Sequence, residues 1–218
     1  MYEKLNQKRG WGWPHIVVAM IALILAVGAV MPLFNRVLEK APQSMAIGNC
    51  KQIATALKIN AGDHGGKYPD LAEPSPTTSN QAFRIFFRED ILQDERLFNC
   101  PMSKFQTDGK IGSAPDFSKA VEPGENHWVM TKGVTDQSSV LMPLVFENPL
   151  VPSWPPVWNS KVEGKPGKGR VWRGGKIVVG FNDTSVQAVK IELPTNGESQ
   201  KDVFTGAAAS MKILDIEE

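Results

Sequence analysis

The chain is poor in the residues that most often build catalytic and metal centres. Its 218 residues include 2 cysteines and 3 histidines, and no Cys/His set has the spacing of a zinc site. No serine lies in a nucleophile elbow, and no Gly-Lys pair is followed by Ser or Thr, as a phosphate loop requires. We therefore expect no enzyme, no catalytic residue and no resident cofactor.

An excess of charge of either sign is also missing. The 24 Lys and Arg residues are matched by 23 Asp and Glu residues, and the net charge of +1 argues against a dedicated polyanion binder. The basic segment 161–176 follows Trp158 and contains Trp172, so it could hold nucleic acid or an anionic polysaccharide through Arg170 and Trp172. We expect a solvated loop instead, and no nucleic-acid partner.

One long apolar run is present. Residues 16–34 carry no charge, and at about 1.5 Å per residue they cover about 28 Å, close to the thickness of a hydrocarbon core. The basic leader 1–10 places the N-terminus in the cytoplasm by the positive-inside bias. We predict an anchor helix over 11–35, single-pass in the inner membrane, with the C-terminal head in the periplasm or outside. The alternative is a secretory signal cleaved after Ala29.

An amphipathic helix is expected to extend the anchor over residues 36–64. Pro32 predicts a kink, and Pro42 predicts a restart of the helix. Glycines at 62, 65 and 66 predict its end. The apolar face recurs at three- and four-residue intervals, in the order Ala46, Cys50, Ile53, Ala54, Leu57 and Ala61.

Residues 65–218 are expected to form one α+β head. Residues 80–88 predict a short helix with four core residues, Ala82, Phe83, Phe86 and Phe87. Residues 140–146 predict a strand, and residues 176–181 and 186–191 predict a hairpin around Asn182-Asp183-Thr184. The fold class predicted is thus α+β, with a long N-terminal transmembrane-plus-amphipathic helix packed against a small antiparallel sheet.

The two cysteines are far apart in the sequence. An oxidising exterior would let Cys50 and Cys100 form a disulfide, worth roughly 2 to 4 kcal/mol in the chain-entropy model. Two buried free thiols are the alternative.

A loop rich in proline and tryptophan covers residues 149–158. Its four prolines make it stiff, so Trp154 and Trp158 could be presented to a partner. Packing of the loop over the sheet edge is the alternative, and the one we favour.

Several segments resemble a known family. Residues 49–57 (NCKQIATAL), 63–69 (DHGGKYP), 98–101 (FNCP) and 174–183 (GGKIVVGFND) are similar to segments of type IV pilin-like proteins. The closest likeness is to the prepilin-type and type II secretion pseudopilin-like proteins of planctomycetes and verrucomicrobia. The resemblance implies a pilin-like fold.

The resemblance also assigns roles near the N-terminus. A prepilin peptidase would cut between Gly10 and Trp11, and the new N-terminus would be methylated. Pro32 lies where the family often has a proline. The fifth residue after the cleavage site is usually glutamate in the family, but here it is His15. A minor or tip subunit, an uncleaved relative and a plain interfacial histidine all remain open.

The function implied is that of a membrane-anchored pseudopilin subunit. It would assemble with other pilin-like subunits through its N-terminal helix, into a type II secretion or pilus-like filament. The alternatives are an uncleaved single-pass protein with a ligand-binding head and a secreted soluble domain. Some pseudopilins bind calcium, for which Asp183 is a weak candidate. Asp63, His64 and Asp70 form a second group, which we expect to be a turn rather than a metal site.

Overall fold

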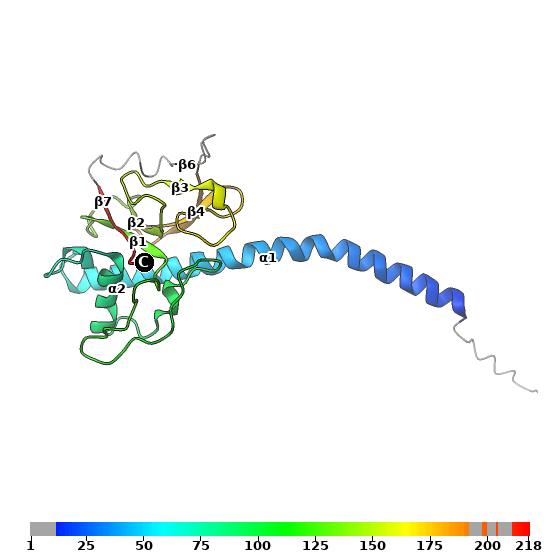
Figure 1. The fold of residues 1–218 in the computed structure, drawn as a ribbon, viewed down its shortest axis with the longest axis horizontal. Helices are drawn as coiled ribbons and strands as arrows, with labels where there is room; N and C mark the ends of the chain where they lie inside the picture. Colours follow the sequence, from blue (N-terminus) through cyan, green and yellow to red (C-terminus); the bar gives the residue numbers. More distant parts are fainter. Residues whose placement is uncertain (1–11, 192–197, 200–203, 205–210) are drawn as a thin grey trace, which may run out of the picture. The chain divides into compact units, whose positions relative to one another are not determined.

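The computed structural model describes residues 12–191, 198–199, 204 and 211–218 (Figure 1). For residues 29–39, 160 and 198–199 it describes the backbone alone. The chain divides into two compact units, residues 1–41 and residues 42–218.

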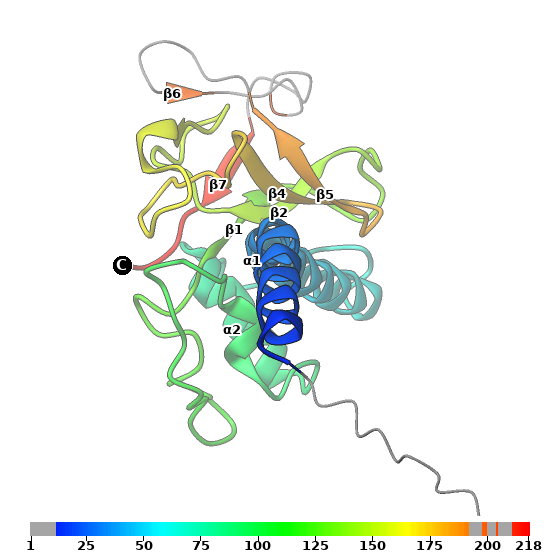
Figure 2. The same cartoon turned by 90° about the vertical axis from the view of Figure 1, so that its right-hand side faces the viewer.

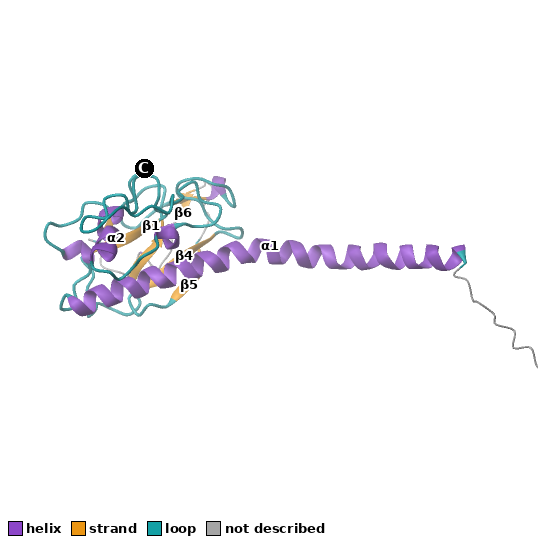
Figure 3. Ribbon diagram, turned by 90° about the horizontal axis from the view of Figure 1, so that it is seen from below, coloured by secondary structure: helices purple, strands orange, loops and turns teal. Residues whose placement is uncertain are grey.

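The first unit contains the N-terminal part of helix α1, which runs from Trp13–Asp63 (Figure 3). Its described side chains form no core. Nine large apolar side chains are between 49% and 79% exposed: Trp13, Ile16, Val18, Met20, Ile21, Leu23, Ile24, Leu25 and Val27. A helix that is apolar on every side is normally buried in a larger structure.

The predicted membrane anchor is corrected by this structure. Among the described residues, no helix is long and apolar enough to cross a membrane. Residues 29–34 of the predicted span lie outside the described side chains. The predicted transmembrane helix over 11–35 and the single-pass placement in the inner membrane are therefore not supported.

The predicted pilin-like fold class is wrong on the same ground, because it required a transmembrane-plus-amphipathic helix. The second unit is a mixed α and β structure around a five-stranded antiparallel sheet, in the order β5-β4-β2-β1-β7. Its strands are β1 (Trp128–Lys132), β2 (Pro143–Glu147), β4 (Lys176–Phe181), β5 (Val186–Lys190) and β7 (Lys212–Leu214). Two short strands, β3 (Trp158–Asn159) and β6 (Glu198–Ser199), form a second sheet.

The apolar face predicted for residues 36–64 is confirmed where it enters this unit. All six predicted core residues, Ala46, Cys50, Ile53, Ala54, Leu57 and Ala61, are fully buried. Helix α1 ends at Asp63, where Gly65 and Gly66 take positive φ angles of 61° and 84°. The expected restart at Pro42 is wrong, since α1 continues through this residue.

Helix α2 (Ser79–Arg88) is also confirmed. Thr78 is its N-cap, and the Thr78 hydroxyl accepts a hydrogen bond from the backbone N–H of Gln81 at 3.2 Å. The four predicted core residues of α2 are all buried. Three short 3-10 helices complete the unit: η1 (Pro69–Leu71), η2 (Glu95–Phe98) and η3 (Ser160–Val162).

The sheet separates two apolar cores, and the helices cover one of its faces (Figure 2). Along β4, Val178 faces the core shared with α1 and α2, whereas Ile177 and Val179 face the opposite core. This alternation is the two-residue period of a strand. A register shift between Pro143 and Val145 interrupts it in β2, which lets Leu144 and Val145 both face the helices.

Candidate functional site: a buried charged cluster

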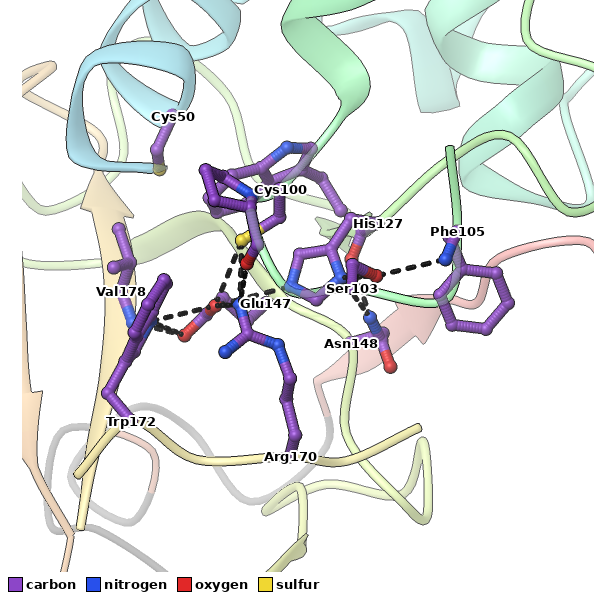
Figure 4. Close-up of polar contacts among 12 residues, drawn as sticks. Cys50, Cys100, Ser103, Phe105, His127, Glu147, Asn148, Arg170, Trp172 and Val178 are labelled. Carbon is purple, nitrogen blue, oxygen red and sulfur yellow. Dashed lines mark hydrogen bonds and ion pairs between the residues drawn. The ribbon is translucent and has the colours of Figure 1, made fainter. Parts of the chain in front are cut away.

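The polar side chains that the sheet brings together lie inside the head, not on its surface. Glu147 is the last residue of β2, and His127 directly precedes β1, which pairs with β2. Arg170 and Trp172 come from the segment before β4, the neighbour of β2 on its other side. Cys100 follows η2. We call Cys100, His127, Glu147, Arg170 and Trp172 the buried cluster (Figure 4).

Glu147 is the centre of this cluster. Its carboxylate accepts hydrogen bonds from Trp172 Nε1 at 3.0 Å, Val178 N at 2.8 Å and Arg170 Nη2 at 3.2 Å. His127 Nε2 lies 3.2 Å from Glu147 Oε1. Since Glu147 is fully buried, these donors replace the water that an ionised carboxylate would otherwise require.

Arg170 supplies the positive charge. It is 1% exposed, and its Nη2 donates to Cys100 Sγ at 2.8 Å and to Pro101 O at 3.1 Å. Its guanidinium lies 4.2 Å from the ring centre of Trp172. Two of its nitrogens, Nε and Nη1, find no hydrogen-bond partner among the described residues. The guanidinium therefore uses only part of its hydrogen-bonding capacity.

The hydrogen bonds of His127 define its tautomer. Asn148 Nδ2 donates to His127 O at 2.8 Å, and Asn148 Oδ1 accepts from Gly169 N at 3.2 Å, which fixes the orientation of the Asn148 amide. The same Nδ2 donates to His127 Nδ1 at 2.9 Å, so Nδ1 is an acceptor. The ring proton is then on Nε2, where it is donated to Glu147.

Charges in the cluster balance without any added ion. Burial lowers the pKa of His127, which keeps the imidazole neutral. Burial would by itself raise the pKa of Glu147, but the hydrogen bond from His127 and the charge of Arg170 lower it overall. Burial first, and the charge of Glu147 second, raise the pKa of the Cys100 thiol. One carboxylate thus faces one guanidinium.

Potential metal ligands occur in two groups within the described residues. Cys100, His127 and Glu147 place one ligand atom each within 4.8 Å of one another. Glu95, Asp108 and Glu125 form the second group. In that group Glu95 accepts backbone N–H groups from Gly109 at 2.8 Å and Val121 at 2.9 Å, so its carboxylate already holds the loop that it faces.

The predicted disulfide is not formed. Cys50 and Cys100 are both free and buried. Each thiol has its own partner: Cys50 Sγ donates to Val145 O at 3.8 Å, and Cys100 Sγ donates to Glu147 Oε1 at 3.5 Å. The spacing of the cysteines carried no information on these partners, which belong to strand β2.

The aromatic and basic residues proposed as a partner surface belong to the core. Trp158, Trp172 and Arg170 are between 0% and 4% exposed. Trp154 is partly buried, with its ring 5.6 Å from that of Phe204. The favoured alternative, a loop packed over the sheet, is therefore the one observed for residues 154–158. A presented surface made of these four residues is wrong.

The remaining predicted residues are not brought together. Gly10 and Trp11 lie outside the described residues, as does the side chain of Pro32. His15 is exposed in the first turns of α1. Asp183 accepts a hydrogen bond from Ser185 N at 2.8 Å in the β4–β5 turn. His64 Nε2 lies 3.2 Å from Glu89 Oε1, and His64 belongs to neither group of potential ligands.

The buried cluster was missed by the sequence analysis. Its members are separated by 20 or more residues of chain, except for Arg170 and Trp172, and no short motif joins them. One signal was available: Glu147 ends an apolar run (Leu144-Val145-Phe146), and an acidic residue at the end of a buried strand needs a partner.

The chain matches no family model, no curated protein and no solved structure.

The cluster predicts how stability depends on pH. The folded-state pKa values of Glu147 and His127 are lowered, so the unfolded state binds protons first as the pH falls below about 6.5. The pKa values of Cys50 and Cys100 are raised, so the unfolded thiols ionise first above about pH 8.5. We expect the free energy of unfolding to be highest between these limits, as urea denaturation with chelator and reductant would measure. Constant stability from pH 7 down to pH 4 would contradict this assignment.

Proposed function

We propose that this protein is an assembly subunit, which packs against further copies or related chains through the N-terminal part of α1. This is the role that its resemblance to pseudopilins implies. The observation that carries the proposal is the exposed apolar surface of residues 13–27, where nine large side chains contact solvent. Contiguous apolar surface of this extent typically marks an interaction site.

The energetics favour burial of this surface. Covering one large aliphatic side chain stabilises by roughly 1.5 to 3 kcal/mol, so even partial coverage of nine side chains would offset the several kcal/mol lost on association. Residues 13–28 carry no Lys, Arg, Asp or Glu. A second apolar helix is therefore a suitable occupant, and another copy of the same segment provides one.

A role without catalysis is supported by the position of the reactive groups. The Ser103 hydroxyl lies 2.7 Å from His127 Nδ1, and the Cys100 thiol belongs to the same cluster. All three side chains are buried. A substrate in solution has no contact with them. We therefore propose that the head has no enzymatic activity of its own.

Substitution of two equally exposed leucines should affect self-association differently. Leu25 in α1 is 68% exposed and Leu141 in the head is 70% exposed. If residues 13–27 form the interface, Leu25→Glu should weaken self-association at least about tenfold, because a charge would be buried at the contact, whereas Leu141→Glu should leave it unchanged. Sedimentation velocity of the full chain over a range of concentrations measures both. Equal effects of the two substitutions, or a wild-type chain that stays monomeric, would contradict the proposal.

A second candidate function is ligand binding by the head. A groove of ≈ 650 Å³ lies between α2 and the segment 72–76, with His64 and Glu89 among its lining residues. A volume of this size suits a small molecule or a short peptide. A wild-type chain that remains monomeric in the sedimentation experiment would favour this candidate over assembly.

A further inference from the structure

Within the buried cluster, the guanidinium of Arg170 lies against the thiol of Cys100 and the carboxylate of Glu147. Arg170 Nη2 lies 2.8 Å from Cys100 Sγ and 3.2 Å from Glu147 Oε1. The same carboxylate oxygen lies 3.2 Å from His127 Nε2. A thiol, an imidazole and a carboxylate therefore converge where the protein holds a positive charge.

The distances from Glu147 Oε1 to the other two ligand atoms fit a tetrahedral zinc ion. Zinc bonds of about 2.3 Å to sulfur and about 2.0 Å to nitrogen or oxygen give tetrahedral edges of about 3.5 Å from sulfur to oxygen and about 3.3 Å from nitrogen to oxygen. The corresponding distances here are 3.5 Å from Cys100 Sγ to Glu147 Oε1 and 3.2 Å from His127 Nε2 to Glu147 Oε1. These two edges would change little on binding, and the ligand atoms of Cys100 and His127 lie within 4.8 Å of one another.

Arg170 occupies this position at a cost. Its Nε and Nη1 are buried without a partner among the described residues, and each unsatisfied buried donor costs about 1 to 3 kcal/mol. The outer contacts that a metal-bound histidine and carboxylate usually have are already present. Ser103 Oγ lies 2.7 Å from His127 Nδ1, and Val178 N donates to Glu147 Oε2 at 2.8 Å.

We propose that Cys100, His127 and Glu147 form a binding site for zinc, in which the ion competes with the guanidinium of Arg170 for the same position. On binding, the Cys100 thiol releases its proton to solvent. The His127 proton moves from Nε2 to Nδ1, where Ser103 Oγ accepts it and the Asn148 amide shifts away. The thiolate and the carboxylate then balance the charge of the ion, and a water molecule is the fourth ligand. The Arg170 guanidinium gives up Cys100 Sγ and Glu147 Oε1 and keeps its contacts with Pro101 O and the Trp172 ring.

Cobalt(II) is the probe, because tetrahedral cobalt has visible d–d bands and a thiolate ligand adds a near-ultraviolet charge-transfer band. The full chain, treated with chelator and reductant, should bind one cobalt ion per chain with both sets of bands, and zinc should displace it. Cys100→Ser should lose the charge-transfer band. Cys50→Ser is the matched control, since Cys50 is equally buried but lies outside the ligand group, and it should keep the band.

Arg170→Gln separates competition from a merely structural role. Removing the competing charge should tighten cobalt binding about tenfold or more in the folded variant, as judged by circular dichroism. If that variant fails to fold, the cobalt titration of the wild-type chain still tests whether the site binds a metal. A folded wild-type chain without the thiolate band, or equal loss of the band in Cys50→Ser and Cys100→Ser, would overturn the proposal.

Discussion

Replacing Glu147 with glutamine is expected to destabilise the metal-free protein by about 3 to 5 kcal/mol. The substitution keeps the shape of the side chain but removes the only carboxylate that faces Arg170 in the cluster. Arg170 is 1% exposed, so its charge would be left in a low-dielectric environment without a counter-ion. Trp172 Nε1 and Val178 N would also lose their charged acceptor. Urea denaturation followed by circular dichroism, with chelator present, measures the loss.

Glu73→Gln is the control for this prediction. Glu73 is exposed, and neutralising an exposed carboxylate usually changes stability by less than about 0.5 kcal/mol. A loss of under 1 kcal/mol for Glu147→Gln, similar to that of Glu73→Gln, would mean that the buried cluster does not organise the head as described.

Gly169→Ala is expected to have the second large effect, a loss of about 2 to 5 kcal/mol. Gly169 has a φ of +67°, a conformation that costs other residues about 1 to 2 kcal/mol, and an added Cβ would lie 2.6 Å from Leu150 Cα. Backbone atoms cannot move aside as a flexible side chain can, so overpacking adds about 1 to 3 kcal/mol. Gly169 also donates to Asn148 and directly precedes Arg170, so the shift would reach the buried cluster.

Gly174→Ala isolates the contribution of backbone conformation. Gly174 has a φ of +81°, but an added Cβ there meets nothing within 4 Å. We expect a loss of about 1 kcal/mol from this variant, measured by the same denaturation. If both variants lost the same amount, the close approach of Gly169 to Leu150 would have no energetic consequence.

Elements governed by local periodicity were predictable from the sequence. The buried stripe of α1, the four core residues of α2 and the β4–β5 hairpin all follow from spacings of three to four residues or of two. The turn Asn182-Asp183-Thr184 joins β4 and β5 as expected, and Thr184 takes a φ of 66°. In each case the signal and the structure involve the same few neighbouring residues.

Features that depend on long-range pairing were not predictable in this way. The partners of Cys50 and Cys100 are set by β2, which neither cysteine adjoins in sequence. Arg170 lies in a segment whose composition indicated a solvated loop, yet it is buried because it neutralises Glu147. The membrane anchor was inferred from hydropathy and flanking charge, and no helix of the described residues is both long and apolar enough to form it. A charge pattern reports residue types, whereas burial depends on which segments meet.

The buried cluster and the exposed part of α1 have different roles in the chain. The cluster joins β1, β2 and the segment before β4 through one carboxylate, and it belongs to the stability of the head. Residues 13–28 of the first unit contribute apolar surface and carry no Lys, Arg, Asp or Glu. The assembly proposal rests on the second feature alone, so its test must address residues 13–27.

Positional disulfide trapping in the full chain tests that claim most directly. Both native cysteines are buried, so a cysteine introduced at an exposed position is the only accessible thiol. Val18→Cys in α1 and Val140→Cys in the head replace side chains that are 66% and 59% exposed. The account predicts that mild oxidation links copies rapidly through position 18 and not through position 140. Equal yields of cross-linked chains at the two positions, or none at position 18, would contradict it.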